Sequence, residues 1–359
     1  MSRILIAPDS FKGSATSIEV AAAIAKGWLS RRPNDELIQI PFADGGEGTL
    51  LAIERAQPMA QRIYCTKVSP DAYWLLVDQS TAIVELAQVS GLTLLKALNP
   101  MGAHTYAFGQ VLAMAAQDPR VERIYCALGG SASTDAGVGA LMALGFEFLD
   151  SSGASVDLGG QALSEIESIS IKNVISAPKD GIVLLVDVHS PLLGKDGASA
   201  VFAPQKGATV DQEVLLEKAL KHFAQITGSI DRPGSGAAGG TAFGLCALWG
   251  ARISGGAAKI AELCGLEAAL TSSDLVITGE GRLDWQSFQG KVVGHISERA
   301  RAAGVPIAYC VGSINGDFPS SSAGGVSLSE IAGSTAEAIA NPVNYLIQAG
   351  AQLAHHVYH

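Results

Sequence analysis

The sequence is poor in aromatic side chains and in positive charge. Aromatic residues make up 6% of the 359 residues, the formal net charge is −10, and the pI is about 5.2. An acidic chain is repelled by the polyanionic surfaces of nucleic acids and of anionic membranes. We therefore expect neither partner, although a local basic site can still bind a small anion.

Cysteines and long apolar runs are also scarce. The five cysteines are scattered without CxxC spacing, so buried free thiols and a reducing, cytoplasmic location are expected. No stretch reaches the ~18 unbroken apolar residues that a transmembrane helix needs. The chain opens with an apolar run at residues 3–7, which predicts a strand rather than a signal peptide.

The common nucleotide-binding motifs are missing. Gly290 and Lys291 are followed by Val292 rather than by Ser or Thr, which excludes a P-loop, and the HRD and DFG signatures of protein kinases are absent. Residues 234–239 match GxGxxG, but residues 227–233 do not form the preceding strand that a dinucleotide site requires. We interpret that segment as a glycine-rich stretch that lets a helix pack closely or contacts a phosphate.

What the chain does contain is typical of an α/β protein. It has 41 glycines and 48% hydrophobic residues, and its length suggests two domains of ~150 residues each. Strand-like runs at residues 4–7 and 37–41 alternate with helical patterns at residues 17–30 and 48–57, which predicts a parallel sheet with helices on its faces. The same alternation returns at residues 275–311, and we expect both parts to share one sheet.

The pattern changes near residue 61. Three short β-like runs at residues 62–68, 73–77 and 81–85 are separated by turn residues, which indicates an antiparallel meander. We interpret this meander as the start of a second, inserted domain. Nearer the C-terminus, residues 320–334 read as a loop and residues 335–353 as one closing helix.

Three segments combine glycine with acidic or hydroxyl residues. They are residues 44–49 (DGGEGT), 129–135 (GGSASTD) and 278–284 (TGEGRLD), and each follows or abuts an apolar run that reads as a strand. Glycine lets backbone N–H groups approach an anion, and carboxylates on the same loop can hold a hard cation. Any one of them fits an ordinary turn, but the three together predict phosphoryl transfer with Mg²⁺.

Asp187 and three lysines are further candidates. Asp187 ends an apolar run at residues 181–188, where a carboxylate can face a ligand crevice; a helix or turn cap is the alternative. Lys12, Lys206 and Lys291 lie beside glycine, where a lysine is suited to bind a phosphate or a carboxylate. A solvated surface charge is the alternative for each lysine.

The ordered set of motifs resembles the bacterial type I glycerate kinases. The segments that carry the resemblance follow the family order over nearly the whole chain: residues 6–13, 43–49, 128–139, 187–194, 203–208, 237–240, 274–284 and 289–291. The resemblance implies a Rossmann-like parallel α/β domain with a second, inserted α/β domain and an active site in the cleft between them. We expect the first domain to comprise residues 1–60 and 240–359, and the inserted domain residues 61–239.

The resemblance also implies the reaction, which is Mg²⁺-dependent phosphorylation of D-glycerate by ATP. Formation of 2-phosphoglycerate is favoured over 3-phosphoglycerate. Two alternatives stay open: a kinase for a related small hydroxy acid, and a non-catalytic sugar-acid sensor on the same fold. The sequence does not decide between a monomer and a homodimer.

The expected site residues fall into four groups. Asp187 is expected to orient the attacking hydroxyl, with Asp284 and Asp44 as further catalytic residues, and Glu280 and Asp284 to hold Mg²⁺. The residues expected at ATP are Gly129, Gly130, Ser131, Lys206, Lys291, Gly279 and Gly281. The residues expected at glycerate are Ser10, Lys12, Asp44, Glu47 and Arg282.

The chain departs from the family pattern at a few positions. Thr134 stands where the family has Asn, Ala136 where it has Gly, and Ser190 where Asn usually precedes Pro191. The carboxylates, the lysines and most glycines of the motifs are intact. These departures concern the fine contacts to the substrate rather than the class of reaction.

Overall fold

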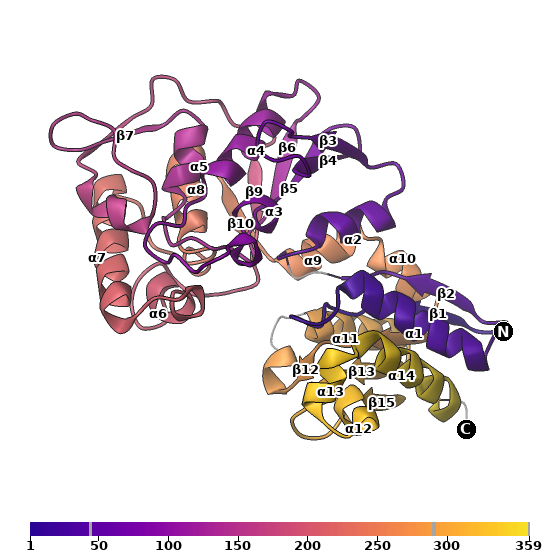
Figure 1. Cartoon of the computed structure of the whole chain (residues 1–359). Helices are drawn as coiled ribbons and strands as arrows, with labels where there is room; N and C mark the ends of the chain where they lie inside the picture. The colour runs from indigo at the N-terminus through magenta and orange to yellow at the C-terminus, as the bar shows by residue number, and fades with distance from the viewer. Residues whose placement is uncertain (43–44, 289–291, 358–359) are drawn as a thin grey trace. The chain divides into compact units, whose positions relative to one another are not determined.

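The chain folds as two units, shown in the computed structural model of Figure 1, which describes residues 1–42, 45–288 and 292–357. Unit 1 comprises Met1–Asp44, Leu51–Pro58 and Ala257–His359, and unit 2 comprises Gly45–Leu50 and Met59–Gly256. Residues 45–50, 59–60 and 240–256, which we expected in the first domain, thus cluster with unit 2. Two candidate residues, Asp44 and Lys291, lie outside the described residues.

Unit 1 is built on a parallel sheet whose strands come from both ends of the chain. The strand order is β15-β13-β11-β1-β2, and Ile4 of β1 pairs with Leu275 of β11, which confirms that the first and last parts of the chain share a sheet. In chain order this is 2-1-3-4-5, a doubly wound arrangement whose direction of winding reverses between β1 and β11. The bounds are β1 Arg3–Ile6, β2 Glu36–Gln39, β11 Leu275–Thr278, β13 Ile307–Val311 and β15 Gly324–Ser327.

The helices of unit 1 pack on this sheet and on one another. Helix α1 (Ser17–Arg31) begins with a capping box between Thr16 and Glu19, and it packs along α14 (Pro342–His356). The two backbones approach closely because Gly27 and Gly350 lie in the contact, where a Cβ would overlap the opposite backbone. The other elements are α2 Thr49–Ala56, which continues from unit 2, α9 Gly256–Leu263, α10 Leu266–Thr271, α11 Val292–Ala303, α12 Leu328–Ala332, α13 Thr335–Ala340, β12 Arg282–Leu283 and β14 Ser313–Ile314.

Two predictions near the C-terminus were wrong. The single helix expected at residues 335–353 is divided into α13 and α14 at Asn341, because Pro342 lacks an N–H group and disfavours the helical conformation of the residue before it. Residues 320–334, expected to be a loop, contain β15 and α12. The short edge strand β15 was not predicted because glycine and serine have little strand propensity.

Unit 2 contains a six-stranded sheet of order β10-β9-β6-β5-β4-β3. Strands β3, β4 and β5 form the predicted antiparallel meander, while β5, β6, β9 and β10 are parallel. The carboxyl ends of these four strands therefore meet at one edge of the sheet. The bounds are β3 Gln61–Tyr64, β4 Tyr73–Val77, β5 Thr81–Glu85, β6 Arg123–Ala127, β9 Ile182–Leu185 and β10 Arg252–Ser254.

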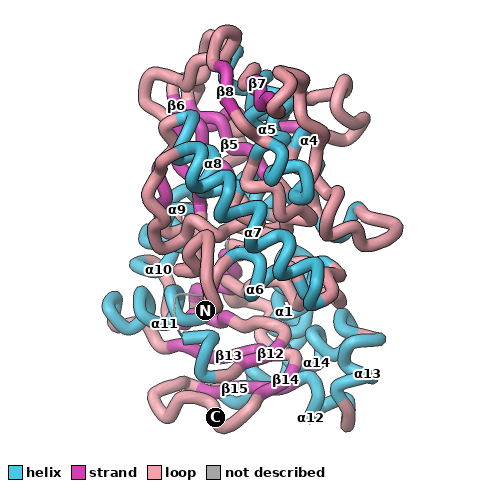
Figure 2. The backbone as a smooth tube through the Cα atoms, turned by 90° about the vertical axis from the view of Figure 1, so that its left-hand side faces the viewer, coloured by secondary structure: helices cyan, strands magenta, loops and turns pink. Residues whose placement is uncertain are grey.

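The helices of unit 2 enclose an aromatic cluster. Phe223 of α7 lies 6.1 Å from both Phe148 and Phe243, measured between ring centroids, and α7 is the long cyan helix of unit 2 in Figure 2. The helices are α3 Ala87–Ser90, α4 Tyr106–Gln117, α5 Val138–Ala143, α6 Ala198–Phe202, α7 Val210–Thr227 and α8 Thr241–Trp249, beside a small antiparallel pair of β7 Glu147–Leu149 and β8 Ser168–Ser170.

The glycine-rich segment at residues 234–240 packs closely in unit 2. A Cβ at Gly239 would overlap the carbonyl oxygen of Ser133, and a Cβ at Gly236 would overlap that of Pro191. Because both contacts are with backbone, only glycine fits there without rearrangement. The segment is thus a close-packing element beside residues 129–135, in agreement with the first of the two sequence interpretations.

The cysteines are free thiols, as expected from the sequence. Cys65, Cys126, Cys264 and Cys310 are buried free thiols, and Cys246 is partly buried. Across the described ranges, the structure has no helix both long enough and apolar enough to cross a membrane.

Candidate active site

A cavity of about 410 Å³ lies in unit 1 at the carboxyl ends of β1 and β11. This is the point where the winding of the sheet reverses, and open α/β sheets bind ligands at that point because the loops diverge there and leave a crevice. The cavity lining comprises Asp9, Ser10, Phe11, Lys12, Ser14, Glu280, Gly281, Arg282, Asp284, Gly312, Ser313, Leu328, Thr335, Ala338 and Ile339.

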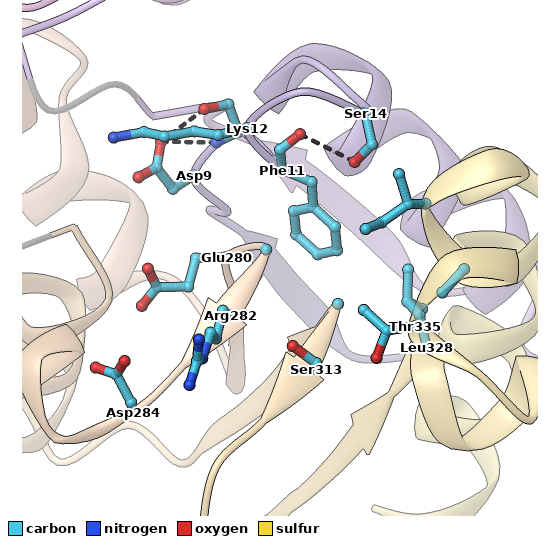
Figure 3. Close-up of a pocket in the computed structure, with 15 residues that line it drawn as sticks. Asp9, Phe11, Lys12, Ser14, Glu280, Arg282, Asp284, Ser313, Leu328 and Thr335 are labelled. Carbon is cyan, nitrogen blue, oxygen red and sulfur yellow. Dashed lines mark hydrogen bonds between the residues drawn. The ribbon is translucent and has the colours of Figure 1, made fainter. Parts of the chain in front are cut away.

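The acidic and the large apolar side chains of this cavity lie on different sides. Figure 3 shows Asp9, Glu280 and Asp284 on one side, and Phe11 and Leu328 on the other. The cations Lys12 and Arg282 also line the cavity. The arrangement suits a ligand with a charged end and an apolar end.

Two residues of the acidic side are oriented by hydrogen bonds to their neighbours. Asp9 is 7% exposed, and its Oδ1 accepts a hydrogen bond from the amide of Ser10 at 2.6 Å. Asp284 Oδ1 accepts from the amide of Gln286 at 2.9 Å, while the Asp284 amide donates to Ser287 Oγ at 3.0 Å. These short-range bonds fix where each carboxylate points.

The carboxylates of the cavity fit Mg²⁺ only in part. Among the described residues, no three His, Cys, Asp or Glu side chains are grouped so as to hold a metal ion by themselves. Mg²⁺ is commonly bound by one or two carboxylates together with waters and substrate phosphates. Glu280 and Asp284 fit a site of that kind, in which waters and substrate phosphates complete the coordination of the ion.

Hydrogen bonds join the two loops that carry these residues. The Asp9 amide donates to the Gly279 carbonyl at 2.8 Å, and Thr278 Oγ1 donates to the Ala7 carbonyl at 2.8 Å. Gly279 packs against β13, where an added Cβ would overlap the Cys310 carbonyl oxygen, whereas a Cβ at Gly281 would find its nearest neighbour, Phe11 Cα, at 3.5 Å. Gly279 is therefore required by packing, whereas a Cβ at Gly281 would make only ordinary van der Waals contacts.

In unit 2, the loop of residues 45–49 lies against the carboxyl edge of the sheet. The Gly129 amide donates to the Gly45 carbonyl at 2.9 Å, and a Cβ at Gly129 would lie 2.5 Å from Gly46 Cα. Two of the glycine-rich segments found in the sequence thus touch each other through backbone. Glu47 is exposed on this loop, and Thr93 Oγ1 donates to its Oε1 at 3.4 Å.

Asp135 ends the second glycine-rich segment and is fully buried. Its Oδ2 accepts from the amide and the hydroxyl of Thr105, both at 2.8 Å, and from the Gly139 amide at 3.2 Å, while Oδ1 accepts from the Gly137 amide at 3.2 Å. With its lone pairs directed to these donors, the carboxylate fixes the starts of α4 and α5. It serves the loop rather than a ligand.

Lys206 lies beneath the same segment and is 2% exposed. Its Nζ donates to Ser131 Oγ at 3.0 Å and to the Ser133 carbonyl oxygen. Burial lowers the pKa of Lys206 to about 8, against the opposing effect of the Asp135 carboxylate. The lysine therefore braces the loop from inside, and it does not reach an open surface where ATP would bind.

Asp187 follows β9 at the carboxyl edge of unit 2 and is partly buried. Its Oδ1 accepts from the amide of Gly256, the first residue of α9, at 2.8 Å. Asp187 therefore caps the start of α9, which is the alternative role that the sequence left open for it. A cap uses one lone pair of a carboxylate, so it does not by itself exclude a role in chemistry.

The comparisons with known proteins agree on one family. The model of the glycerate kinase family matches residues 4–358. The chain belongs to the glycerate kinase family. The Bacillus subtilis glycerate kinase is 36% identical over 88% of this chain and 86% of its own length, and the Escherichia coli glycerate 2-kinase is 36% identical over the same shares.

A solved structure supports the same membership. The crystal structure of a Salmonella typhimurium LT2 protein assigned as glycerate kinase 2 superposes with a TM-score of 0.76 at 32% identity, covering 99% of this chain and 97% of the other. The expected α/β fold is thereby confirmed. As a member of the glycerate kinase family, the protein is an enzyme and a kinase.

The structure distributes the candidate residues of this glycerate kinase family member between two places. The cavity of unit 1 brings together Ser10, Lys12, Glu280, Gly281, Arg282 and Asp284, with Gly279 adjacent. The carboxyl edge of unit 2 carries Glu47, Gly129, Gly130, Ser131 and Asp187, with Lys206 underneath. Residues expected at ATP thus occur in both units.

Sequence reasoning missed Asp9 and Glu85. Asp9 lines the cavity, and Glu85 contacts the loop that carries Glu47. The available signal was the one that pointed to Asp187, namely an acidic residue at the end of an apolar strand.

Substituting the two glycines of the third segment should have unequal effects on stability. Gly279→Ala forces a methyl group into the Cys310 carbonyl, and should lower the free energy of unfolding by about 3 kcal/mol or more. Gly281→Ala meets only ordinary contact distances and should change it by less than about 0.5 kcal/mol. Equilibrium denaturation of both variants measures this, and equal losses would contradict the packing argument.

Burial of Lys206 should make stability depend on pH. Because its pKa is about 8 in the folded state and 10.5 in the unfolded state, the unfolded chain binds more protons between these pH values. The free energy of unfolding of the wild type, minus that of Lys206→Met, should therefore rise by roughly 3 kcal/mol from pH 8 to pH 10.5. Denaturant titrations of both proteins give this difference, and a flat profile would show that the lysine is solvated.

Proposed function

We propose that this protein transfers the γ-phosphoryl group of ATP to the 2-hydroxyl of D-glycerate with the help of Mg²⁺. The family and the curated relatives support a glycerate kinase, and the printed name of the Escherichia coli relative, a glycerate 2-kinase, supports the 2-position. The observation that carries the proposal is the cavity of unit 1, where carboxylates and cations line one wall at the switch point of the sheet.

ATP is the proposed ligand of this cavity. A volume of about 410 Å³ exceeds what a three-carbon acid fills. The wall formed by Phe11, Leu328, Ala338 and Ile339 offers apolar surface to a base. At the other end, Lys12 and Arg282 would bind the phosphates.

The metal belongs to the same end of the cavity. Glu280 and Asp284 would hold Mg²⁺ together with the phosphates, with Asp9 beside them. When bound, the ion neutralises charge that develops on the transferring group. Ser10, Lys12 and Arg282, expected at glycerate from the sequence, are thus reassigned to the nucleotide.

D-glycerate is proposed to bind at the carboxyl edge of unit 2. Glu47 is exposed there, and Asp187 follows β9 at the same edge. Phosphoryl transfer needs a hydroxyl aligned with the phosphorus rather than covalent help from the protein. Asp187 would orient that hydroxyl and accept its proton, while Gly129, Gly130 and Ser131 shape the edge and Lys206 braces it from below.

The product tests the reaction directly. ATP, Mg²⁺ and D-glycerate incubated with the protein should yield 2-phosphoglycerate, whose ³¹P NMR signal is a doublet from the single proton on C2. A triplet from the C3 methylene would reassign the acceptor hydroxyl. A metal-stripped sample in excess EDTA should form no product, and undiminished turnover there would overturn the role given to Mg²⁺.

Asp187→Asn separates catalysis from capping. Asparagine keeps an oxygen that can accept from the Gly256 amide but loses the charge, so kcat should fall by roughly 10²-fold or more with a modest change in the KM for glycerate. The melting temperature should stay near that of the wild type. Asp187→Ala, which also removes the cap, is the matched control and should melt earlier; an Asn variant with normal kcat would leave Asp187 as a cap alone.

A further inference from the structure

Glu85 is a buried acid that the proposed mechanism does not use. It is the last residue of β5, is 6% exposed, and pairs with Ala127 in the neighbouring strand β6. A buried carboxylate is costly unless hydrogen-bond donors satisfy it. The position of its partners therefore shows what the residue does.

Both carboxylate oxygens of Glu85 receive backbone amides from the start of α2. Oε1 accepts from the Gly48 amide at 3.0 Å, and Oε2 accepts from the Leu50 amide at 2.9 Å. The first turn of a helix has N–H groups without partners inside the helix, and its positive dipole end favours a negative charge. Glu85, at the end of strand β5, supplies both the acceptors and the negative charge to the start of α2.

The loop held in this way is the one that carries Glu47. Other hydrogen bonds also hold it. The Gly45 carbonyl accepts from the Gly129 amide at 2.9 Å, Thr49 Oγ1 donates to the Gly46 carbonyl at 2.7 Å, and Thr93 Oγ1 donates to Glu47 Oε1 at 3.4 Å. Gly45 and Gly48 have φ angles of 83° and 87°, in the left-handed region that few other residues tolerate. Glu85 thus fixes the C-terminal half of a tightly folded loop.

We propose that Glu85 is a positioning residue that holds the loop of residues 45–50 and so sets the place of Glu47 in the substrate site. The positioning of glycerate rests on the function proposed above, whereas the hold on the loop does not. Both oxygens are needed because two amides, those of Gly48 and Leu50, point at one side chain. Burial, with the neighbouring Glu47, raises the pKa of Glu85 to about 7 against the effect of these amides, which agrees with a carboxylate enclosed beneath the loop.

Glu85→Gln tests the proposal with little change in size. Glutamine offers one oxygen and turns an NH₂ group toward a donor, so one of the two amides loses its acceptor. Hydrogen exchange at the Gly48 and Leu50 amides should become at least tenfold faster. If glycerate is the substrate, its KM should rise about tenfold, with a smaller change in kcat and in the KM for ATP.

Val84→Ala is the matched control. Val84 is the preceding residue of β5 and is fully buried, so its truncation weakens the same strand without removing a hydrogen bond to the loop. It should leave exchange at Gly48 and Leu50 and the KM for glycerate close to those of the wild type. If Glu85→Gln does not fold, Glu85→Asp, which retracts the charge by one methylene, should show the same increases.

Two results would overturn the proposal. One is unchanged exchange at both amides in Glu85→Gln; the other is faster exchange with an unchanged KM, which would mean that the loop does not position the substrate. The exchange measurement needs no turnover. An inactive wild type would therefore refute the proposed reaction and still leave the hold of Glu85 on the loop tested.

Discussion

Parallel strand pairing is the constraint on which both candidate sites depend. In unit 1, β1 and β11 run in the same direction although about 270 residues separate them, so residues 9–12 and 280–284 emerge at one edge and line one cavity. In unit 2, β5, β6, β9 and β10 do the same. Each strand on its own ends in an ordinary polar turn; the shared direction is what gathers acids and glycines into sites.

The acidic residues of the two units have different roles. Asp135 and Glu85 have their oxygens directed to backbone donors. The Lys206 ammonium donates hydrogen bonds to the loop of residues 129–135. These groups hold the glycine-rich segments in shape, since a buried charge without such partners would be destabilising. Asp9, Glu280 and Asp284 line a cavity, although Asp9 and Asp284 also accept one backbone amide each.

Much of this arrangement could be predicted from the sequence. Short apolar runs bounded by turn residues located β1, β11 and the meander of β3, β4 and β5, because buried strands need continuous apolar surface. The break at Asn341 was missed because the helical periodicity continues on both sides of Pro342. The edge strand β15 was missed because its residues, Gly324–Ser327, have little strand propensity and are recruited by pairing with β13.

The site itself was harder to predict than the fold. Motif reasoning found Glu280, Asp284, Lys12 and Arg282, which the structure brings together. It could not show that Lys206 points inward, because burial of a lysine depends on tertiary partners such as Ser131. It also could not distinguish a carboxylate that binds a ligand from one that accepts backbone amides, as Glu85 does, since both stand at the end of a strand.

The cavity of unit 1 is the proposed nucleotide site, and the roles given to both units depend on this assignment. Hydrogen–deuterium exchange with and without ADP and Mg²⁺ tests this most directly, because it reports on each loop and needs no acceptor substrate. Nucleotide should slow exchange in residues 9–14 and 280–284, whereas D-glycerate alone should not. Protection of these loops by D-glycerate alone, or nucleotide protection confined to residues 45–50 and 129–135, would contradict it.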